Sequence, residues 1–168
     1  DWPKALEKPN MTLILRPEPI TAEAFAPYGK LLTRPSAAGR MDYSDSLMNL
    51  RSDATPCFRT SLTEPTPLPL TTRTMERHEF SSQAFLPVDV GRYLVMVAPH
   101  DTDGGPDVDK LRLFEVDGDT GISYDANVWH HPMTVLDRPA TFATVMFLDG
   151  GAGDEQFVDL PVEVEIRP

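Results

Sequence analysis

The sequence predicts an all-β fold, either a barrel or a sandwich, and three observations support that prediction. The chain of 168 residues contains 17 prolines, and proline interrupts helices because it lacks the amide hydrogen that a helix interior needs. Short apolar runs recur along the chain and are separated by turn residues, a pattern that indicates strands. No apolar run is long enough to span a membrane. Many short strands with frequent turns are typical of barrels and sandwiches.

The first part of the chain predicts two strands on either side of a short helix. Residues 12–16 and residues 30–33 are the predicted strands. Thr21 can cap a helix over residues 22–25 because its hydroxyl can accept a bond from an amide of the first turn, and a Pro-Tyr-Gly sequence ends that helix. Residues 34–56 carry no pattern that predicts an element.

The rest of the chain predicts strands joined by turns. Residues 71–80 form the first of them, and alternation places Thr72, Thr74, Glu76, His78 and Phe80 on one face. Further strands are predicted over residues 83–87, 91–98, 111–116, 141–148 and 162–166.

Composition limits the classes of function. The net charge of −11 argues against a nucleic-acid partner, because phosphate binding needs a basic patch, but it still allows a small anionic substrate. The single cysteine, Cys57, and the lack of a signal-peptide pattern favour a reducing, cytoplasmic compartment. The length favours one domain over residues 11–168, with residues 1–10 as an appended extension.

Two stretches carry residues that could do chemistry. Glu76 and His78 lie two positions apart and can face one cavity, and Gln83 follows five residues later, as a hairpin partner could. A second imidazole comes from residues 121–132. Such a set suits Ni, Zn, Mn or Fe, and without a metal it could provide a general base. Arg112 is a candidate anchor for a substrate carboxylate.

The second stretch contains the adjacent histidines His130 and His131, which follow a predicted turn at Asn127. Asn127 tolerates a left-handed backbone, so an extended segment can begin after it. Alternation then places His130 on the opposite face from Trp129 and His131, and one histidine of the pair can face a cavity.

Each pattern has an ordinary structural explanation. A Glu-x-His pair on a strand is more often a solvated pair than a ligand pair. A Trp-His-His run serves core packing about as often as a site, and an arginine such as Arg112 is more often part of a surface ion pair.

Taken together, the two stretches closely resemble the ureidoglycolate lyase family. The resemblance is carried by Met75-Glu76-Arg77-His78, Gln83-Ala84-Phe85-Leu86-Pro87 and Asn127-Val128-Trp129-His130-His131-Pro132. Ala24-Phe25-Ala26-Pro27-Tyr28-Gly29 and Leu111-Arg112-Leu113-Phe114 also look like that family. One departure stands out: the family usually shows Tyr-His-Arg where this chain has Tyr124-Asp125-Ala126.

The resemblance implies a single cupin-like β-barrel of jelly-roll type, forming a homodimer, that cleaves (S)-ureidoglycolate to glyoxylate and urea. It places Glu76, His78, Gln83 and His130 where a cupin holds its metal, so one divalent ion, Ni or Zn, is a candidate cofactor. His130 should therefore face the cavity.

The implied reaction assigns roles to these residues and to others. His78 or Glu76 would be the base, His130 a metal ligand or acid, and Tyr124 a hydrogen-bond donor. Residues expected to contact the substrate are Arg112, Gln83, Trp129 and His131. Two alternatives remain: a non-catalytic cupin that binds a small carboxylate or a metal, and a hydrolase that releases ammonia from the same substrate.

Overall fold

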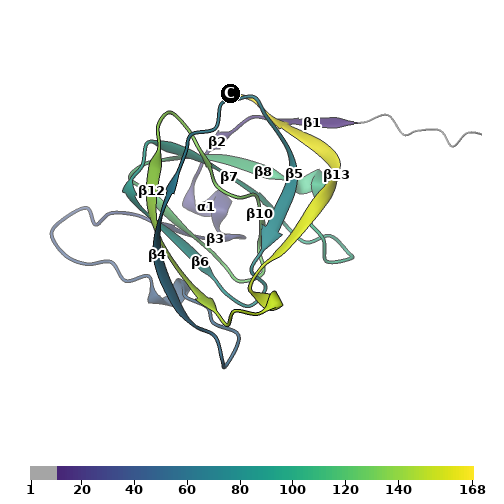
Figure 1. The fold of residues 1–168 in the computed structure, drawn as a ribbon. Helices are drawn as coiled ribbons and strands as arrows, with labels where there is room; N and C mark the ends of the chain where they lie inside the picture. Colours follow the sequence, from purple (N-terminus) through teal and green to yellow (C-terminus); the bar gives the residue numbers. More distant parts are fainter. Residues whose placement is uncertain (1–10) are drawn as a thin grey trace, which may run out of the picture.

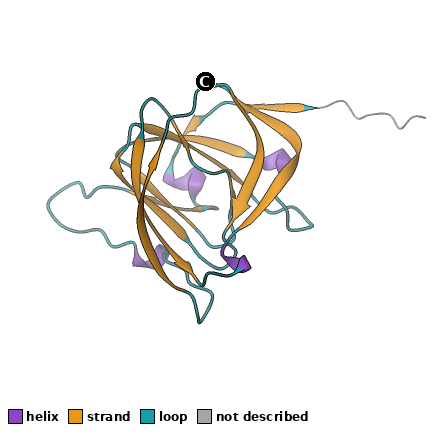
Figure 2. Ribbon diagram, viewed as in Figure 1, coloured by secondary structure: helices purple, strands orange, loops and turns teal. Residues whose placement is uncertain are grey.

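The computed structural model describes residues 11–168, and strands dominate them (Figures 1 and 2). The first elements are β1 (Thr12–Leu15), β2 (Glu18–Pro19), α1 (Ala22–Phe25), β3 (Gly29–Leu32), a 3-10 turn (Ser44–Ser46) and β4 (Thr55–Thr63). The middle elements are β5 (Leu70–Arg77), β6 (Gln83–Asp89), β7 (Arg92–Ala98), a 3-10 turn (Val108–Lys110), β8 (Arg112–Asp117) and β9 (Gly121–Tyr124). The last are β10 (Trp129–His130), β11 (Thr134–Val135), β12 (Ala140–Leu148), a 3-10 turn (Ala152–Asp154) and β13 (Gln156–Ile166). The extension predicted for residues 1–10 lies outside the described residues.

Two curled sheets build the barrel. The order in the first is β1-β13-β5-β10-β7-β8-β2, with β11 beside β7, and the order in the second is β3-β9-β6-β12-β4. Figure 1 shows β4 and β12 on one side of the barrel and β5 and β13 on the other. The predicted all-β, cupin-like barrel is thus confirmed. In residues 11–168, no helix has the length and apolar character needed to cross a membrane.

Strand β7 is buried on both faces, which explains its unbroken apolar sequence. Tyr93, Val95 and Val97 belong to one hydrophobic cluster, and Leu94, Met96 and Ala98 belong to a second. Alternate side chains of a strand point to opposite faces, so β7 separates these two clusters. The strand predicted over residues 91–98 is confirmed as β7. Its continuous apolar sequence is typical of a strand that is covered on both faces.

Two local predictions about polar residues are confirmed. The Thr21 hydroxyl accepts a hydrogen bond from the amide of Ala24 at 3.1 Å and caps α1. Asn127 has a left-handed backbone with φ of 70°. Its side-chain oxygen accepts a bond from Arg77 at 2.9 Å, and its amide donates to the carbonyl oxygen of His78 at 2.8 Å. The Asn127 turn is therefore tied to the end of β5.

The structure corrects the predicted relation between the first His-bearing strand and Gln83. The strand ends at Arg77 rather than at residue 80, and β6 is not the hairpin partner of β5, because the two strands belong to different sheets. The chain crosses between the sheets through Ser81 and Ser82, which are buried. The Ser82 amide donates to the Met48 carbonyl, so the crossing is fixed by a segment that local sequence does not reveal.

Two strands, β4 and β13, differ from prediction in their bounds. β4 occupies part of a region without a predicted element, and it pairs with β12 along its whole length. β13 begins at Gln156, six residues before the predicted start. Pro161 argued against a strand in this part of the sequence, since proline cannot donate a ladder hydrogen bond. The structure accommodates Pro161 at a register shift between Asp159 and Val164.

Candidate active site

A carboxylate and two imidazoles meet where β5 ends. Glu76 on β5 lies directly opposite His130 on β10 in an antiparallel pair, and the side chains of paired residues project from the same face. His78 follows β5 and is buried. The potential ligand atoms of Glu76, His78 and His130 all lie within 4.8 Å of one another.

Backbone carbonyls orient both imidazoles. The Nδ1 of His78 lies 2.8 Å from the carbonyl oxygen of Asp154, and the Nδ1 of His130 lies 2.9 Å from that of Val128. A carbonyl oxygen only accepts, so each Nδ1 carries the proton and each Nε2 holds a lone pair. Both Nε2 atoms are buried without a hydrogen-bond partner among the described residues. The Nε2 of His130 is 3.3 Å from Glu76 Oε1, close enough for an ion pair but without hydrogen-bond geometry.

These residues fit a divalent metal ion. Histidine ligands of metals commonly donate their other ring nitrogen to a carbonyl or carboxylate, which fixes the tautomer, and His78 and His130 both do so. Buried polar atoms without partners are rare in folded proteins, and a metal would satisfy both Nε2 atoms. Two imidazoles with a carboxylate suit Ni or Zn. The Oε1 of Gln83 is also buried without a partner.

Burial and neighbouring charge set the ionisation of this cluster. Burial lowers the pKa of His78, and the nearby His130 lowers it further. Burial on its own would raise the pKa of Glu76, but the close contact with His130 outweighs that effect and lowers the pKa. Burial raises the pKa of Tyr124 well above its ordinary value. At neutral pH these directions leave Glu76 ionised, His78 neutral and Tyr124 protonated.

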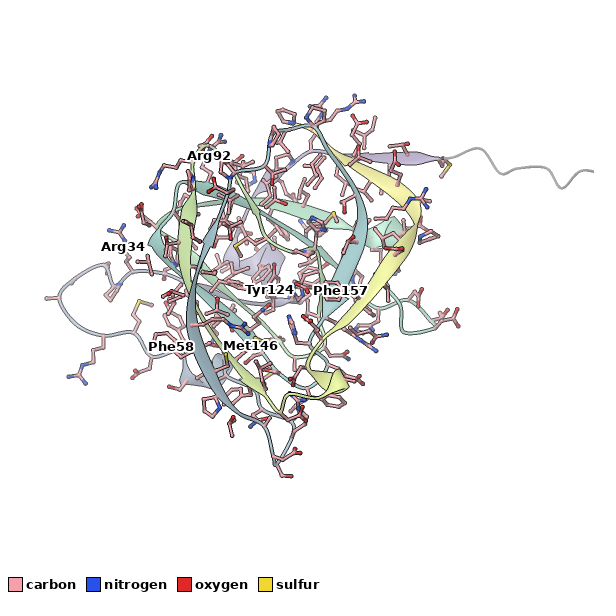
Figure 3. The ribbon with its side chains drawn as sticks, in the orientation of Figure 1. Arg34, Phe58, Arg92, Tyr124, Met146 and Phe157 are labelled. Carbon is pink, nitrogen blue, oxygen red and sulfur yellow. The ribbon has the colours of Figure 1, made fainter. Side chains whose placement is uncertain are left out.

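A cavity of about 420 Å³ opens beside Glu76 and His78. Its opposite wall consists of side chains from β4, β6 and β12: Arg59, Ser61, Gln83, Phe85, Thr144 and Met146. Arg59 on β4 and Phe85 on β6 both lie opposite Thr144 on β12, the strand between them. The three side chains therefore point to the same face of the sheet. The cavity therefore lies between the two sheets. Figure 3 shows Tyr124 near the centre of the view and Met146 below it.

The structure does not bring Arg112 to this cavity. Its guanidinium forms an ion pair with Glu18 at 2.7 Å and lies 4.9 Å from the centre of the Phe114 ring. In the described part of the chain, Arg59 is the only basic residue among those that line the cavity with Glu76 and His78. The structure thus places the predicted anchor Arg112 outside this cavity, because it stands at the start of β8 on another part of the surface.

The residues around His130 follow the predicted alternation. The Trp129 ring packs in the second hydrophobic cluster, and its indole N–H donates to the carbonyl of Gly104 at 3.0 Å, so it points away from the cavity. Neither histidine of the pair is among the residues that line the cavity: His130 lies behind Glu76, which does line it, and the Nδ1 of His131 lies 2.8 Å from the Thr74 carbonyl oxygen. Tyr124 stacks on the His130 ring with centroids 4.1 Å apart, and its hydroxyl is buried without a partner.

Sequence reasoning missed Arg59, Ser61 and Asp154. The alternation of Cys57, Arg59 and Ser61 with apolar residues could have predicted β4, but only the pairing with β12 shows which face looks inward. Asp154 gave no signal, because it contributes its backbone carbonyl to His78.

The chain is similar to known proteins of one family. The family model described as ureidoglycolate lyase matches residues 12–165. A ureidoglycolate lyase of Burkholderia cepacia is 33% identical over 162 residues, covering 90% of this chain and 88% of the relative. One from Schizosaccharomyces pombe is 29% identical, covering 88% and 93%, and one from Brucella anthropi is 35% identical, covering 80% and 82%.

The barrel and its acid–imidazole cluster define a cupin-type enzyme. The chain belongs to the ureidoglycolate lyase family, so the predicted family and the predicted lyase class are confirmed. Among solved structures, a dTDP sugar isomerase from Desulfovibrio desulfuricans is similar at 18% identity and a TM-score of 0.48, covering 79% of this chain and 83% of that one. An oxalate decarboxylase from Bacillus subtilis is similar at 16% identity and a TM-score of 0.41, covering 85% and 29%. At these scores the likenesses say nothing about the chemistry of the site.

Proposed function

We propose that this protein cleaves (S)-ureidoglycolate to glyoxylate and urea in the cavity beside Glu76 and His78. Family membership supports the reaction. The observation that supports this location is the buried cluster of Glu76, His78 and His130, of which Glu76 and His78 line a cavity that also contains one arginine.

The substrate carries a hydroxyl group and a ureido nitrogen on the same carbon. Removal of the hydroxyl proton lets the oxygen form a carbonyl, the carbon–nitrogen bond breaks, and its electron pair leaves with the nitrogen, which takes up a proton as urea departs. Glu76 and His78 are both candidates for the base, because their lowered pKa values keep both of them unprotonated at neutral pH.

A divalent ion, Ni or Zn, held by Glu76, His78, His130 and Gln83, would lower the pKa of the substrate hydroxyl as a Lewis acid. With such an ion bound, the Nε2 lone pair of His78 would be a ligand and would not be available as the base. Tyr124 is the proposed donor to the substrate oxygen, since burial raises its pKa and keeps the hydroxyl protonated. Stacking against Tyr124 also fixes the plane of the His130 ring.

Arg59 takes the role of carboxylate anchor in place of Arg112. The guanidinium fork matches a carboxylate, and the hydrogen bond that Arg59 donates to the sulfur of Met146, at 3.4 Å, is a weak one. Strands β4 and β5 belong to opposite sheets, so the substrate would be held from one wall while it reacts at the other.

One experiment tests the proposed reaction. Metal-stripped protein and protein loaded with Ni or Zn are incubated with ureidoglycolate, and glyoxylate, urea and ammonia are measured. Glyoxylate with equimolar urea is expected. Glyoxylate with ammonia would identify a hydrolase, and binding without turnover would identify a non-catalytic cupin.

The proposed assembly is a homodimer in the cytoplasm. On the outer face of the second sheet, Phe58, Leu62, Leu86 and Val88 are exposed. Phe58 lies opposite Val145 and Leu86 lies opposite Ala143, so the middle of this face carries no charge. In a chain with a net charge of −11, an uncharged face can meet its two-fold copy without repulsion. Light scattering should give twice the chain mass, and Phe58→Asp should give monomers.

The single free cysteine, Cys57, fits a reducing compartment.

A further inference from the structure

A compact loop after β12 supports the backbone carbonyl that orients His78. In this loop the Asp154 carboxylate accepts bonds from the amides of Asp149 and Gly150 at 3.0 and 2.8 Å. The Asp149 carboxylate accepts a bond from the amide of Gly151 at 2.7 Å. The two carboxylates thus hold the loop of residues 149–154 in one conformation.

Arg51 lies between those carboxylates and is nearly buried. Its Nη1 is 3.0 Å from Asp149 Oδ2 and 2.9 Å from Asp154 Oδ1, and its side chain is only 12% exposed. Its Nη2 donates to the carbonyl of Phe147 at 3.1 Å, and the guanidinium lies over the Phe80 ring. One arginine therefore joins the end of β12, the loop and the segment that follows His78.

The loop acts on His78 through a single atom. The Asp154 carbonyl lies 2.8 Å from His78 Nδ1, and this contact decides which ring nitrogen carries the proton and where Nε2 points. Arg51 does not line the cavity. Of the residues that Arg51 contacts, Asp154 is the one that contacts His78.

We propose that Arg51 is a positioning residue that sets the tautomer and orientation of His78 through Asp154. The Arg51–Asp154 ion pair, with little exposure to solvent, keeps the Asp154 carbonyl directed at Nδ1. Without it, the loop loses the cation that neutralises its two facing carboxylates, and the His78 ring loses its fixed acceptor. The kinetic consequence rests on the proposed role of His78 in ureidoglycolate cleavage, whereas the structural consequence does not.

The test uses the intact protein without substrate. It contains four histidines, and a long-range ¹H–¹⁵N spectrum at alkaline pH reports which nitrogen of each ring carries the proton, with His78 assigned by its loss in His78→Ala. The parent should show His78 protonated at Nδ1. In Arg51→Ala the two nitrogen shifts of His78 should move toward each other, as expected for mixed tautomers, and Arg51→Lys should restore part of the parent spectrum.

Kinetics with ureidoglycolate complete the test. In Arg51→Ala, kcat should fall by about tenfold or more while KM stays within about twofold, as expected for the loss of a group that orients a reacting residue. Arg92 is a matched control because it also bridges two carboxylates, Glu115 and Asp137. It lies far from Met146 of the cavity wall in Figure 3. Arg92→Ala should leave the His78 spectrum and kcat unchanged.

Two results would overturn the proposal. One is an Arg51→Ala protein whose His78 spectrum matches that of the parent, whatever its activity. The other is a tautomer change of the same size in Arg92→Ala. If Arg51→Ala does not fold, Asp154→Asn breaks the same ion pair from the other side and is judged by the same spectrum. If the protein lacks lyase activity altogether, the proposed function fails while the tautomer result still decides the role of Arg51.

Discussion

His130 Nε2 and Glu76 Oε1 lie 3.3 Å apart across the pairing of β10 with β5. The contact joins residues separated by 54 positions in the chain (130 minus 76), and it places a carboxylate beside an imidazole that has no other partner for Nε2. The surroundings of the Glu76 carboxylate and of the His130 ring are therefore set largely by each other.

His130→Ala should abolish turnover and metal binding, because it removes one of the two free Nε2 atoms of the cluster. His131→Ala is the matched control. His131 is the next residue in the chain and is bonded to Thr74 outside the cavity, so its loss should have a much smaller effect. Steady-state kinetics and calorimetric metal titration measure both. A larger loss in His131→Ala would contradict the assignment of faces to these residues.

His78→Ala should lower kcat by about a hundredfold or more, the usual effect of removing a general base. Its melting temperature should change by only about 2–4 °C, because the main loss is one hydrogen bond of about 1 kcal/mol, to Asp154. Calorimetry and kinetics on the same preparation check both parts. Unfolding at room temperature would show instead that His78 has a structural role in the core.

Arg59→Ala should raise KM about tenfold to a hundredfold, since a hydrogen bond to a charged group contributes about 1.5–3 kcal/mol. Arg112→Ala is the control, because Arg112 is paired with Glu18 outside the cavity, and its KM should match that of the parent. The reverse order of effects would return the anchor role to Arg112.

Asp125→Ala should have a small effect on turnover. Asp125 stands where the family usually has a histidine, and it does not line the cavity, although burial raises its pKa. A severe loss of kcat in this variant, with an unchanged melting temperature, would show that the aspartate contacts the substrate or the metal.

The protein should lose stability as the pH rises above about 10. Burial raises the pKa of Tyr93 in the folded state far above the ordinary value of 10.0. The folded state then holds a proton that the unfolded state releases, so the free energy of unfolding falls by up to about 1.4 kcal/mol per pH unit for this group. Urea unfolding at pH 9, 10 and 11 measures the slope. Tyr93→Phe should reduce the slope.

Local sequence was sufficient where one residue type fixes a local conformation. Thr21 capped α1, Asn127 took the left-handed turn, and the apolar run of β7 formed a strand buried on both faces. Each of these outcomes follows from the preferences of a few neighbouring residues. The motif around Glu76 and His78 also identified the family, since its order and spacing can be read along the chain.

Tertiary structure alone decided which distant residues face the same cavity. Arg59 replaced Arg112 beside the site because β4 pairs with β12, and Asp154 became a partner of His78 through a backbone atom that no side-chain pattern reveals. The sequence by itself determined the apolar strands such as β7, the turn at Asn127 and the acid–imidazole set. The pairing of strands far apart in sequence determined the cavity wall. Which strands pair, and in which register, depends on contacts across the whole barrel rather than on any local preference.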